Sequence, residues 1–314
     1  MLSWTAKCST RWNCSSSTSV LGLFLLAAAI FLLCVQPSVK VELISSNANL
    51  IPLSEHLSLN ITREKYFLVF IIPSHPAHSA VRNTIRQTWM NVSRWNDLSS
   101  IEEQYKRIKV LFIFGSYTDK GDLDEEFYDE MRANSDMYLV SDLREHRTAL
   151  KYKIMWGMKQ VLYRYDFQYV AKTDDDVVVN LPKMISDLRT LPRERFYTGS
   201  CKMGYGGFRG YPKWRYCSGG GYVLSRDVIS KFQQLPSSVH DVPFRPEDAY
   251  TGYLVNRVRA LLEYDVTMYA AKRAKISRYV CGPFVHWFYH CCKTTTKHED
   301  FYGKVSSNSV NACP

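Results

Sequence analysis

The sequence predicts an α/β protein built on a mostly parallel sheet with helices on both faces. Short, nearly continuous apolar runs alternate along the chain with longer stretches of helical character. The 314 residues are 46% hydrophobic and 14% aromatic, which is enough to bury a substantial core. Acidic residues follow one of the apolar runs, at the end of a strand, which is where ligands bind in sheets of this kind.

The first β-α-β unit is predicted over residues 66–115. The run YFLVFIIPS at 66–74 predicts a buried strand closed by Pro73, and VLFIFG at 110–115 predicts a second strand. The segment between them, HSAVRNTIRQTWMNVSRW at 78–95, predicts a helix.

The same alternation continues to the acids. Residues 123–133 predict an acidic helix, 137–140 a strand, 148–165 a long helix and 168–172 a strand that delivers Asp174, Asp175 and Asp176. Further along, the glycines at 219–221 precede a predicted strand at 222–224 and a helix that begins at Ser225.

The N-terminal region predicts a membrane anchor. Residues 20–35 are an unbroken apolar run of 16 residues, and extension to residue 39 gives a length that crosses a thin bilayer. Lys7 and Arg11 precede the run and only Lys40 follows closely, which favours a cytoplasmic tail. A cleaved signal peptide is the alternative, but CVQPSVK offers no good cleavage site. The predicted domains are a tail at 1–19, a signal-anchor at 20–39, a stem at 40–65 and a lumenal domain at 66–314.

Two further features favour a lumenal location. Asn60 and Asn91 begin N-glycosylation sequons. Six cysteines follow the anchor, an even set that predicts up to three disulfides of undetermined connectivity in an oxidising compartment: Cys201, Cys217, Cys281, Cys291, Cys292 and Cys313. Zinc held by His286, His290 and Cys291-Cys292 is an alternative, although adjacent cysteines do not form the usual zinc clamp.

The net charge of +10 does not by itself indicate a nucleic-acid partner. Lysine and arginine are spread along the chain, without a basic run interleaved with aromatic residues and without zinc-finger spacing. We therefore expect no nucleic acid, and a small anionic substrate fits the charge equally well.

Two acidic segments are candidates for chemistry. In YVAKTDDDVVVN, Asp174, Asp175 and Asp176 stand between two apolar runs, where a divalent cation with oxygen ligands offsets their repulsion. A solvated turn is the alternative. In RPEDAY, Glu247 and Asp248 open a predicted helix, and helix capping is the plain alternative.

The glycines between the acidic segments lie in WRYCSGGGYVLS. Gly219 and Gly220 allow the backbone to approach a ligand closely, and a flexible turn is the alternative. The spacing of a Walker phosphate loop is missing.

Five motifs in order resemble the β1,3-galactosyltransferase family of inverting GT-A glycosyltransferases. They are RNTIRQTW, FIFG, KTDDDVVVN, YCSGGGYVLS and EDAYTG, and the likeness extends over about residues 66–258. The chain departs from the family at DLREHRTALK, residues 142–151, which lacks the Tyr and Asn of the family pattern. The resemblance implies a GT-A-type Rossmann-like sheet and a type II membrane protein of the Golgi.

The resemblance also implies a reaction and its residues. The donor would be a UDP-sugar, UDP-galactose first and UDP-N-acetylglucosamine second, and the acceptor a glycan on lipid or protein. Mn²⁺ or Mg²⁺ would neutralise the departing diphosphate. The implied roles are metal ligand for Asp176 and His286, donor contact for Asp174 and Asp175, base for Asp248 with Glu247 second, and diphosphate contact for Arg82 and Arg86.

Two functions of other classes compete with this interpretation. VAKTDDDVV also fits the haloacid-dehalogenase-like pattern, with Asp174 as a phosphoryl-accepting nucleophile. Such enzymes carry that residue on the first core strand, whereas here other predicted strands precede it. A non-catalytic lumenal glycan-binding protein is the second competitor, and the presence of both Asp176 and Asp248 argues against it.

Overall fold

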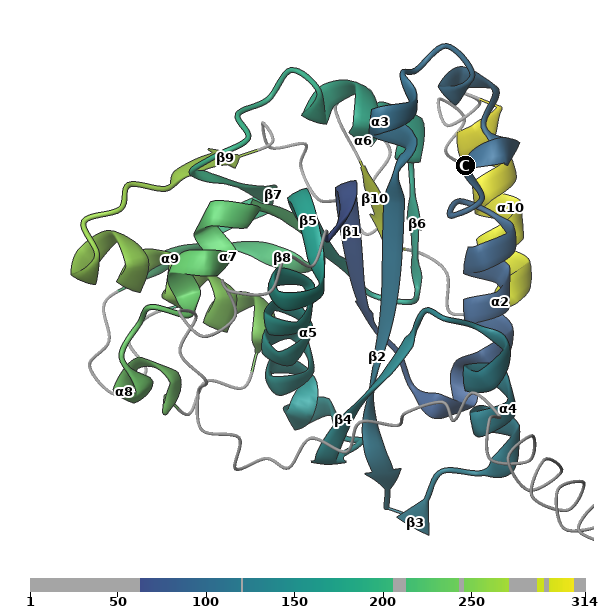
Figure 1. The fold of residues 1–314 in the computed structure, drawn as a ribbon, viewed down its shortest axis with the longest axis horizontal. Helices are drawn as coiled ribbons and strands as arrows, with labels where there is room; N and C mark the ends of the chain where they lie inside the picture. The colour runs from purple at the N-terminus through teal and green to yellow at the C-terminus, as the bar shows by residue number, and fades with distance from the viewer. Residues whose placement is uncertain are drawn as a thin grey trace, which may run out of the picture. The chain divides into compact units, whose positions relative to one another are not determined.

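A mixed sheet of eight strands organises the part of the chain that the computed structural model describes, which is residues 63–119, 121–205, 213–242, 246–270, 287–290 and 294–307 (Figure 1). Its strands are β1 (Glu64–Pro73), β2 (Ile108–Thr118), β3 (Gly121–Asp122), β4 (Met137–Arg144), β5 (Tyr165–Thr173), β7 (Phe196–Tyr205), β8 (Trp214–Ser225) and β9 (Thr267–Ala270). The order is β3-β2-β1-β5-β8-β7-β9, and β4 also pairs with β2. Strands β4, β2, β1 and β5 are parallel, while β8 is antiparallel to β5 and β7. The predicted parallel sheet is therefore confirmed at its centre.

Helices cover both faces of this sheet (Figure 1). Val69 and Ile71 of β1 pack in a cluster with α5 (Leu150–Arg164), α7 (Arg226–Phe232) and α9 (Glu247–Leu261). The alternate residues Phe70 and Ile72 pack in a second cluster with α2 (Ser79–Gln87), α4 (Glu125–Ala133), α6 (Leu181–Leu188) and α10 (Thr295–Ser306). A strand buried on both sides must be apolar at every position, which explains the unbroken run in its sequence.

The predicted helix at 78–95 is shorter in the structure. Helix α2 ends at Gln87, and the chain continues through the 3₁₀ turns η3 (Val92–Arg94) and η4 (Asn96–Leu98). The Thr88 hydroxyl donates to the Thr84 carbonyl at 2.6 Å, and Trp89 is fully buried. The helix therefore ends at this point, because the Thr88 side chain bonds back to the helix and Trp89 packs in the core, although the helical periodicity of the sequence continues.

The glycine segment also differs from its prediction. Gly219, Gly220 and Gly221 lie within β8, so the flexible-turn interpretation is wrong and the strand starts well before residue 222. A Cβ on Gly221 would lie 2.1 Å from the Phe288 ring, so glycine is required for that aromatic side chain to pack on β8. Glycine has a low intrinsic preference for strands, and the pairing of β8 with β5 and β7 compensates for it.

A C-terminal segment packs beside the acids. Strand β6 (Val177–Val179), which follows Asp176, pairs antiparallel with β10 (Phe288–His290), and Val177 faces His290 in the register. Helix α10 contacts both α2 and β6. Residues far apart in sequence therefore meet next to the acidic trio.

Several predictions fall on other parts of the chain. The tail, the anchor at 20–39, all but the last three residues of the stem and the sequon at Asn60 lie outside the described residues. None of the helices in the described ranges combines the length and the apolar character needed to cross a membrane. Asn91 is exposed, and its side chain accepts the Ser93 N–H at 3.2 Å. Its glycosylation stays a prediction.

Candidate active site

Two neighbouring parallel strands bring a serine to the acidic trio. Ile71 of β1 pairs with Lys172 of β5, so Ser74 and Asp175 follow at equivalent positions. The Ser74 hydroxyl donates to Asp175 Oδ2 at 2.7 Å, and His78 Nδ1 lies 2.8 Å from the same oxygen. Burial alone raises the pKa of Asp175, but these two partners outweigh it and hold the pKa below its ordinary value. The hydrogen bond to the Asp175 carboxylate raises the pKa of His78. Asp175 is therefore held by the protein itself.

Lys172 lies buried between the two acidic segments and is 1% exposed. Its Nζ donates to Asp174 Oδ1 at 2.7 Å and to the Gly219 carbonyl oxygen at 2.5 Å, and Glu247 Oε2 lies 3.4 Å away. Burial by itself lowers the pKa of Lys172, but the carboxylates of Asp174, Glu247 and Asp248 outweigh it and raise the pKa. One ammonium therefore offsets charge from both acidic segments.

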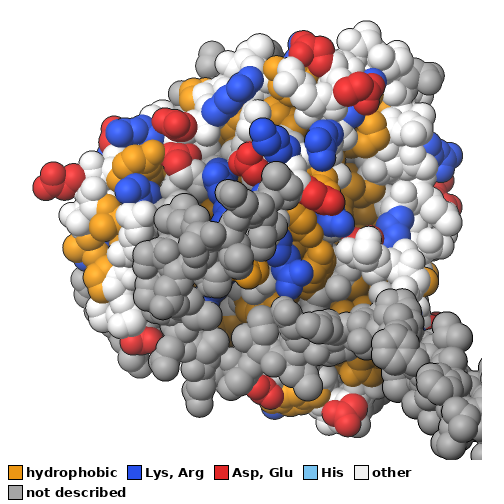
Figure 2. Space-filling view, viewed as in Figure 1, with side chains coloured by type: hydrophobic (Ala, Val, Ile, Leu, Met, Phe, Trp, Pro, Cys, Tyr) orange, Lys and Arg blue, Asp and Glu red, His pale blue; other side chains and the backbone are white. Residues whose placement is uncertain are grey.

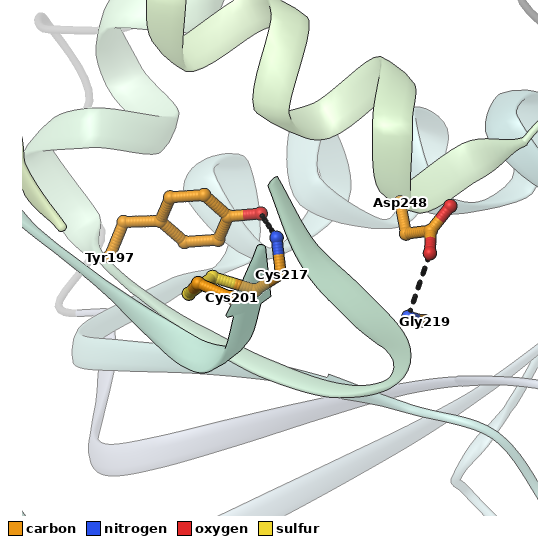
Figure 3. The surroundings of a disulfide bond; sticks show 5 residues. All are labelled: Tyr197, Cys201, Cys217, Gly219 and Asp248. Atoms are coloured by element: carbon orange, nitrogen blue, oxygen red, sulfur yellow. Dashed lines mark hydrogen bonds between the residues drawn. A yellow bond between two sulfur atoms is a disulfide. The ribbon is translucent and has the colours of Figure 1, made fainter. Parts of the chain in front are cut away.

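Asp248 is the second residue of α9 and is partly exposed. Its Oδ2 accepts the Gly219 N–H at 3.1 Å (Figure 3). Its Oδ1 accepts the Ala249 N–H at 2.8 Å. A Cβ on Gly252 would lie 2.4 Å from Tyr216 Cβ, so glycine allows α9 to pack directly on β8. This close approach sets the carboxylate of Asp248 against the backbone of Gly219.

Glu247 occupies a different environment from its neighbour. It is 2% exposed, and its Oε1 accepts hydrogen bonds from the hydroxyls of Tyr222 and Thr251. Burial raises the pKa of Glu247 against the opposing effects of Lys172 and these hydroxyls. A base must come within hydrogen-bond reach of the acceptor hydroxyl. The partly exposed Asp248 meets that condition better than Glu247 does.

A disulfide fastens the strand that carries Gly219. Cys201 of β7 and Cys217 of β8 face each other in the register and are bonded. The Tyr197 hydroxyl accepts the Cys217 N–H at 2.9 Å (Figure 3). Oxidation of this pair agrees with the prediction of a disulfide-forming chain. The predicted partners Cys281, Cys291, Cys292 and Cys313 lie outside the described residues.

Arg82 and Arg86 are joined to α4 and to the strand ends. Arg82 is fully buried, and its guanidinium donates to Glu130, Ser74 Oγ and the carbonyls of His75 and Pro76. Arg86 pairs with Glu130 and Asp136. Arg82 thus has all five of its N–H donors directed to protein acceptors, which leaves none for a diphosphate. The predicted contact is corrected for Arg82: it supports Ser74, which in turn holds Asp175.

The predicted metal ligands lie only partly within the described residues. No group of three or more Asp, Glu, His or Cys side chains among the described residues is arranged to hold a metal ion. His286 lies outside those residues. His298 of α10 is fully buried. Burial lowers the pKa of His298, and the nearby Asp175 and Asp176 oppose that shift. The structure therefore adds an imidazole beside the acids.

Sequence reasoning missed three of these contributors. Lys172 belongs to the motif KTDDDVVVN, and a lysine between an apolar run and three acids is a sequence signal for a buried cation. Ser74 and His298 carry no comparable signal, because only strand register and the packing of α10 bring them to the acids. The structure unites Asp174, Glu247, Asp248 and Gly219 around Lys172, and the Thr173 hydroxyl donates to the Gly220 carbonyl.

Comparison with known proteins identifies relatives of the chain. Residues 80–210 match the family model described as Galactosyltransferase. UDP-GalNAc:beta-1,3-N-acetylgalactosaminyltransferase 1 of Sus scrofa is 28% identical over 225 residues, which is 66% of this chain and 63% of the relative. Beta-1,3-galactosyltransferase 2 of Homo sapiens is 30% identical over 212 residues, 62% of this chain and 48% of the relative. The matched segment thus spans less than two thirds of the length of these curated relatives.

A solved structure of the galactosyltransferase LgtC with donor and acceptor sugar analogues overlaps 78% of this chain and 97% of its own, at 10% identity and a TM-score of 0.41. We draw no conclusion about function from a TM-score of this size. The family match and the curated relatives agree with the five motifs found in the sequence. Over residues 80–210 the chain is thus similar to the galactosyltransferase family.

Proposed function

We propose that the chain is an inverting β1,3-glycosyltransferase of GT-A type that moves a hexose from a UDP-sugar to a glycan acceptor. The observation that carries this proposal is the bridge at Lys172 and Gly219, which joins Asp174 on the donor side to Asp248 on the base side. Galactose is the first expected donor sugar and N-acetylglucosamine the second. The name of the porcine relative adds N-acetylgalactosamine to the sugars to test.

The residues fit a divalent cation in their donor chemistry. Carboxylate oxygens suit Mg²⁺ and Mn²⁺, and imidazole is a common further ligand. Asp176 would hold the ion, with His286 or His298 as the imidazole ligand, because His298 is buried close to Asp175 and Asp176. When bound, the ion would neutralise charge on the departing UDP.

Asp248 would act as the base. Inversion needs a group that takes the proton of the acceptor hydroxyl as its oxygen attacks the anomeric carbon from the face opposite to UDP. The proton passes to the Asp248 carboxylate, the new glycosidic bond forms, and the electron pair of the broken bond leaves with UDP. The N–H groups of Gly219 and Ala249 orient the carboxylate for this step.

The proposed location is the Golgi membrane, with residues 20–39 as the anchor and the catalytic domain in the lumen. The cysteine pair and the exposed Asn91 support an oxidising, glycosylating compartment.

On the face drawn in Figure 2, basic and acidic side chains are intermixed rather than gathered into one basic surface. The absence of nucleic acid among the partners stays a prediction.

The direct test is a donor screen with the fragment 40–314. Transfer from UDP-galactose, UDP-N-acetylglucosamine and UDP-N-acetylgalactosamine to simple sugar acceptors is measured with and without Mn²⁺. The proposal expects metal-dependent transfer from at least one donor, in β1,3 linkage. Binding of glycans without consumption of any UDP-sugar would instead favour a glycan-binding protein, and hydrolysis of phosphate esters without UDP would favour the phosphatase alternative.

A further inference from the structure

Lys172 is the most deeply buried charged group between the two acidic segments, and the proposed chemistry does not use it directly. At 1% exposure its ammonium has no access to a substrate. It contacts three separate elements: it donates to Asp174 after β5 and to the Gly219 carbonyl in β8, and it forms an ion pair with Glu247 at the start of α9. Lys172 therefore links β5, β8 and α9, whereas an ion pair on the surface usually links only two side chains.

Two side-chain connections from Asp174 to Asp248 pass through this ammonium. One runs through Gly219, whose carbonyl accepts from Lys172 and whose N–H donates to Asp248. The other runs through Glu247, which lies 3.4 Å from Lys172 Nζ and immediately precedes Asp248 in α9. The ammonium thus links the expected base to the donor-side carboxylate, in addition to the pairing of β5 with β8.

We propose that Lys172 is a positioning residue that holds Asp174 and Asp248 in the relative arrangement that transfer requires. This inference rests on the proposed function and deepens it. It differs from a purely structural role, in which the lysine would only neutralise the buried Glu247. Misplacing reacting groups by about 1 Å costs about 100-fold in rate, so the positioning role predicts a loss in kcat that persists after stability is restored.

The first test separates these two roles with a charge-balanced pair of substitutions. Lys172→Met alone leaves Glu247 buried without its cation and is expected to lower the melting temperature. Adding Glu247→Gln removes that charge and is expected to restore most of the melting temperature. The positioning role then predicts a kcat about 100-fold below wild type, with KM for the UDP-sugar changed by less than about threefold. Lys151→Met is the matched control, because Lys151 is also buried but donates to the Val242 carbonyl.

A second test leaves the lysine in place. Asp174→Asn and Glu247→Gln are isosteric, and each weakens the bridge from one side. If both act through Lys172, the double variant is little slower than the slower single variant. Independent effects would multiply instead.

The results distinguish failure of the positioning role of Lys172 from failure of the proposed glycosyltransferase function. A wild-type kcat in the Lys172→Met/Glu247→Gln variant overturns the positioning role. So do multiplying effects of Asp174→Asn and Glu247→Gln, which decide the matter even if the Lys172 variants do not fold. Absence of transfer by the wild-type protein with every UDP-sugar overturns the proposed function, and this inference with it.

Discussion

The carboxylate of Asp248 lies 3.1 Å from the backbone nitrogen of Gly219, the residue whose carbonyl oxygen accepts from Lys172. One glycine in β8 thus contacts both the expected base and the buried cation. A Cβ on Gly219 would lie 3.5 Å from Lys172 Nζ and 3.6 Å from Asp248 Cβ, so the three residues are in close contact. The chemistry of the site therefore depends on how α9, β8 and β5 pack, as well as on its carboxylates.

Replacement of the expected base tests its role directly. Asp248→Asn is expected to lower kcat by about 10²–10⁴-fold, because the amide cannot take the acceptor proton. UDP affinity, measured by calorimetry, should stay close to wild type. The control is Asp241→Asn, an exposed position shortly before α9. An Asp248→Asn variant with the wild-type rate would show that another group is the base.

The acidic trio is tested at its last member. Asp176→Ala is expected to abolish metal-dependent turnover and the gain in UDP affinity that Mn²⁺ provides, because a carboxylate ligand is lost. Asp166→Ala, at the opposite end of β5, is the control. UDP binding that responds to Mn²⁺ as strongly in the Asp176 variant as in wild type would contradict the assignment.

The ion-pair group of Arg82, Arg86 and Glu130 predicts a pH dependence of stability. Burial alone raises the pKa of Glu130, but the two arginines outweigh it and leave the pKa below its ordinary 4.5. A lowered carboxyl pKa stabilises the fold above pH 4.5, and this contribution is lost as the pH falls through the folded-state value. Glu130→Gln is expected to cost about 3 kcal/mol at pH 7, and the difference from wild type should shrink below pH 4.5.

Denaturant unfolding at several pH values measures this difference. A gap between wild type and Glu130→Gln that does not depend on pH would show that the pairs with Arg82 and Arg86 do not shift the carboxyl pKa.

The disulfide is expected to contribute both stability and order at Gly219. It closes a loop with a sequence separation of 16 residues, so Cys201→Ala/Cys217→Ala should cost about 3 kcal/mol. Cys217 precedes Gly219 by two residues in β8. We therefore also expect a lower kcat than in the wild type at temperatures where both proteins are folded. Thermal unfolding and initial rates at a low temperature separate the two effects. Unchanged stability would show that the strands do not need the bond.

Glycine substitutions test the packing of the C-terminal segment on β8. Gly221→Ala would place a methyl group 2.1 Å from the Phe288 ring and should cost about 1–3 kcal/mol. Gly303→Ala is the matched control: its Cβ meets nothing within 4 Å in the interior of α10, and it should stabilise by up to about 1 kcal/mol. Melting temperatures that shift in the same direction for both variants would contradict the contact between Phe288 and β8.

Much of the fold was predictable because its signals are local. The buried strands at β1, β2, β4 and β5 are read from apolar runs, and α4, α5 and α9 from periodicity. The predictions that differed from the structure depended on distant contacts. Helix α2 stops where Trp89 enters the core, and the glycines of β8 become strand because β5 and β7 pair with them.

The sequence by itself determined the central α/β sheet, the positions of the two acidic segments and the resemblance to the galactosyltransferase family. Only the tertiary structure decided which groups serve them: it moved Arg82 from a ligand contact into the core, set Ser74 and His298 beside the acids, and placed Lys172 between Asp174 and Glu247. The physical reason is that strand identity follows from local hydrophobic pattern, whereas the environment of a charge depends on register and on which helix packs against the strand.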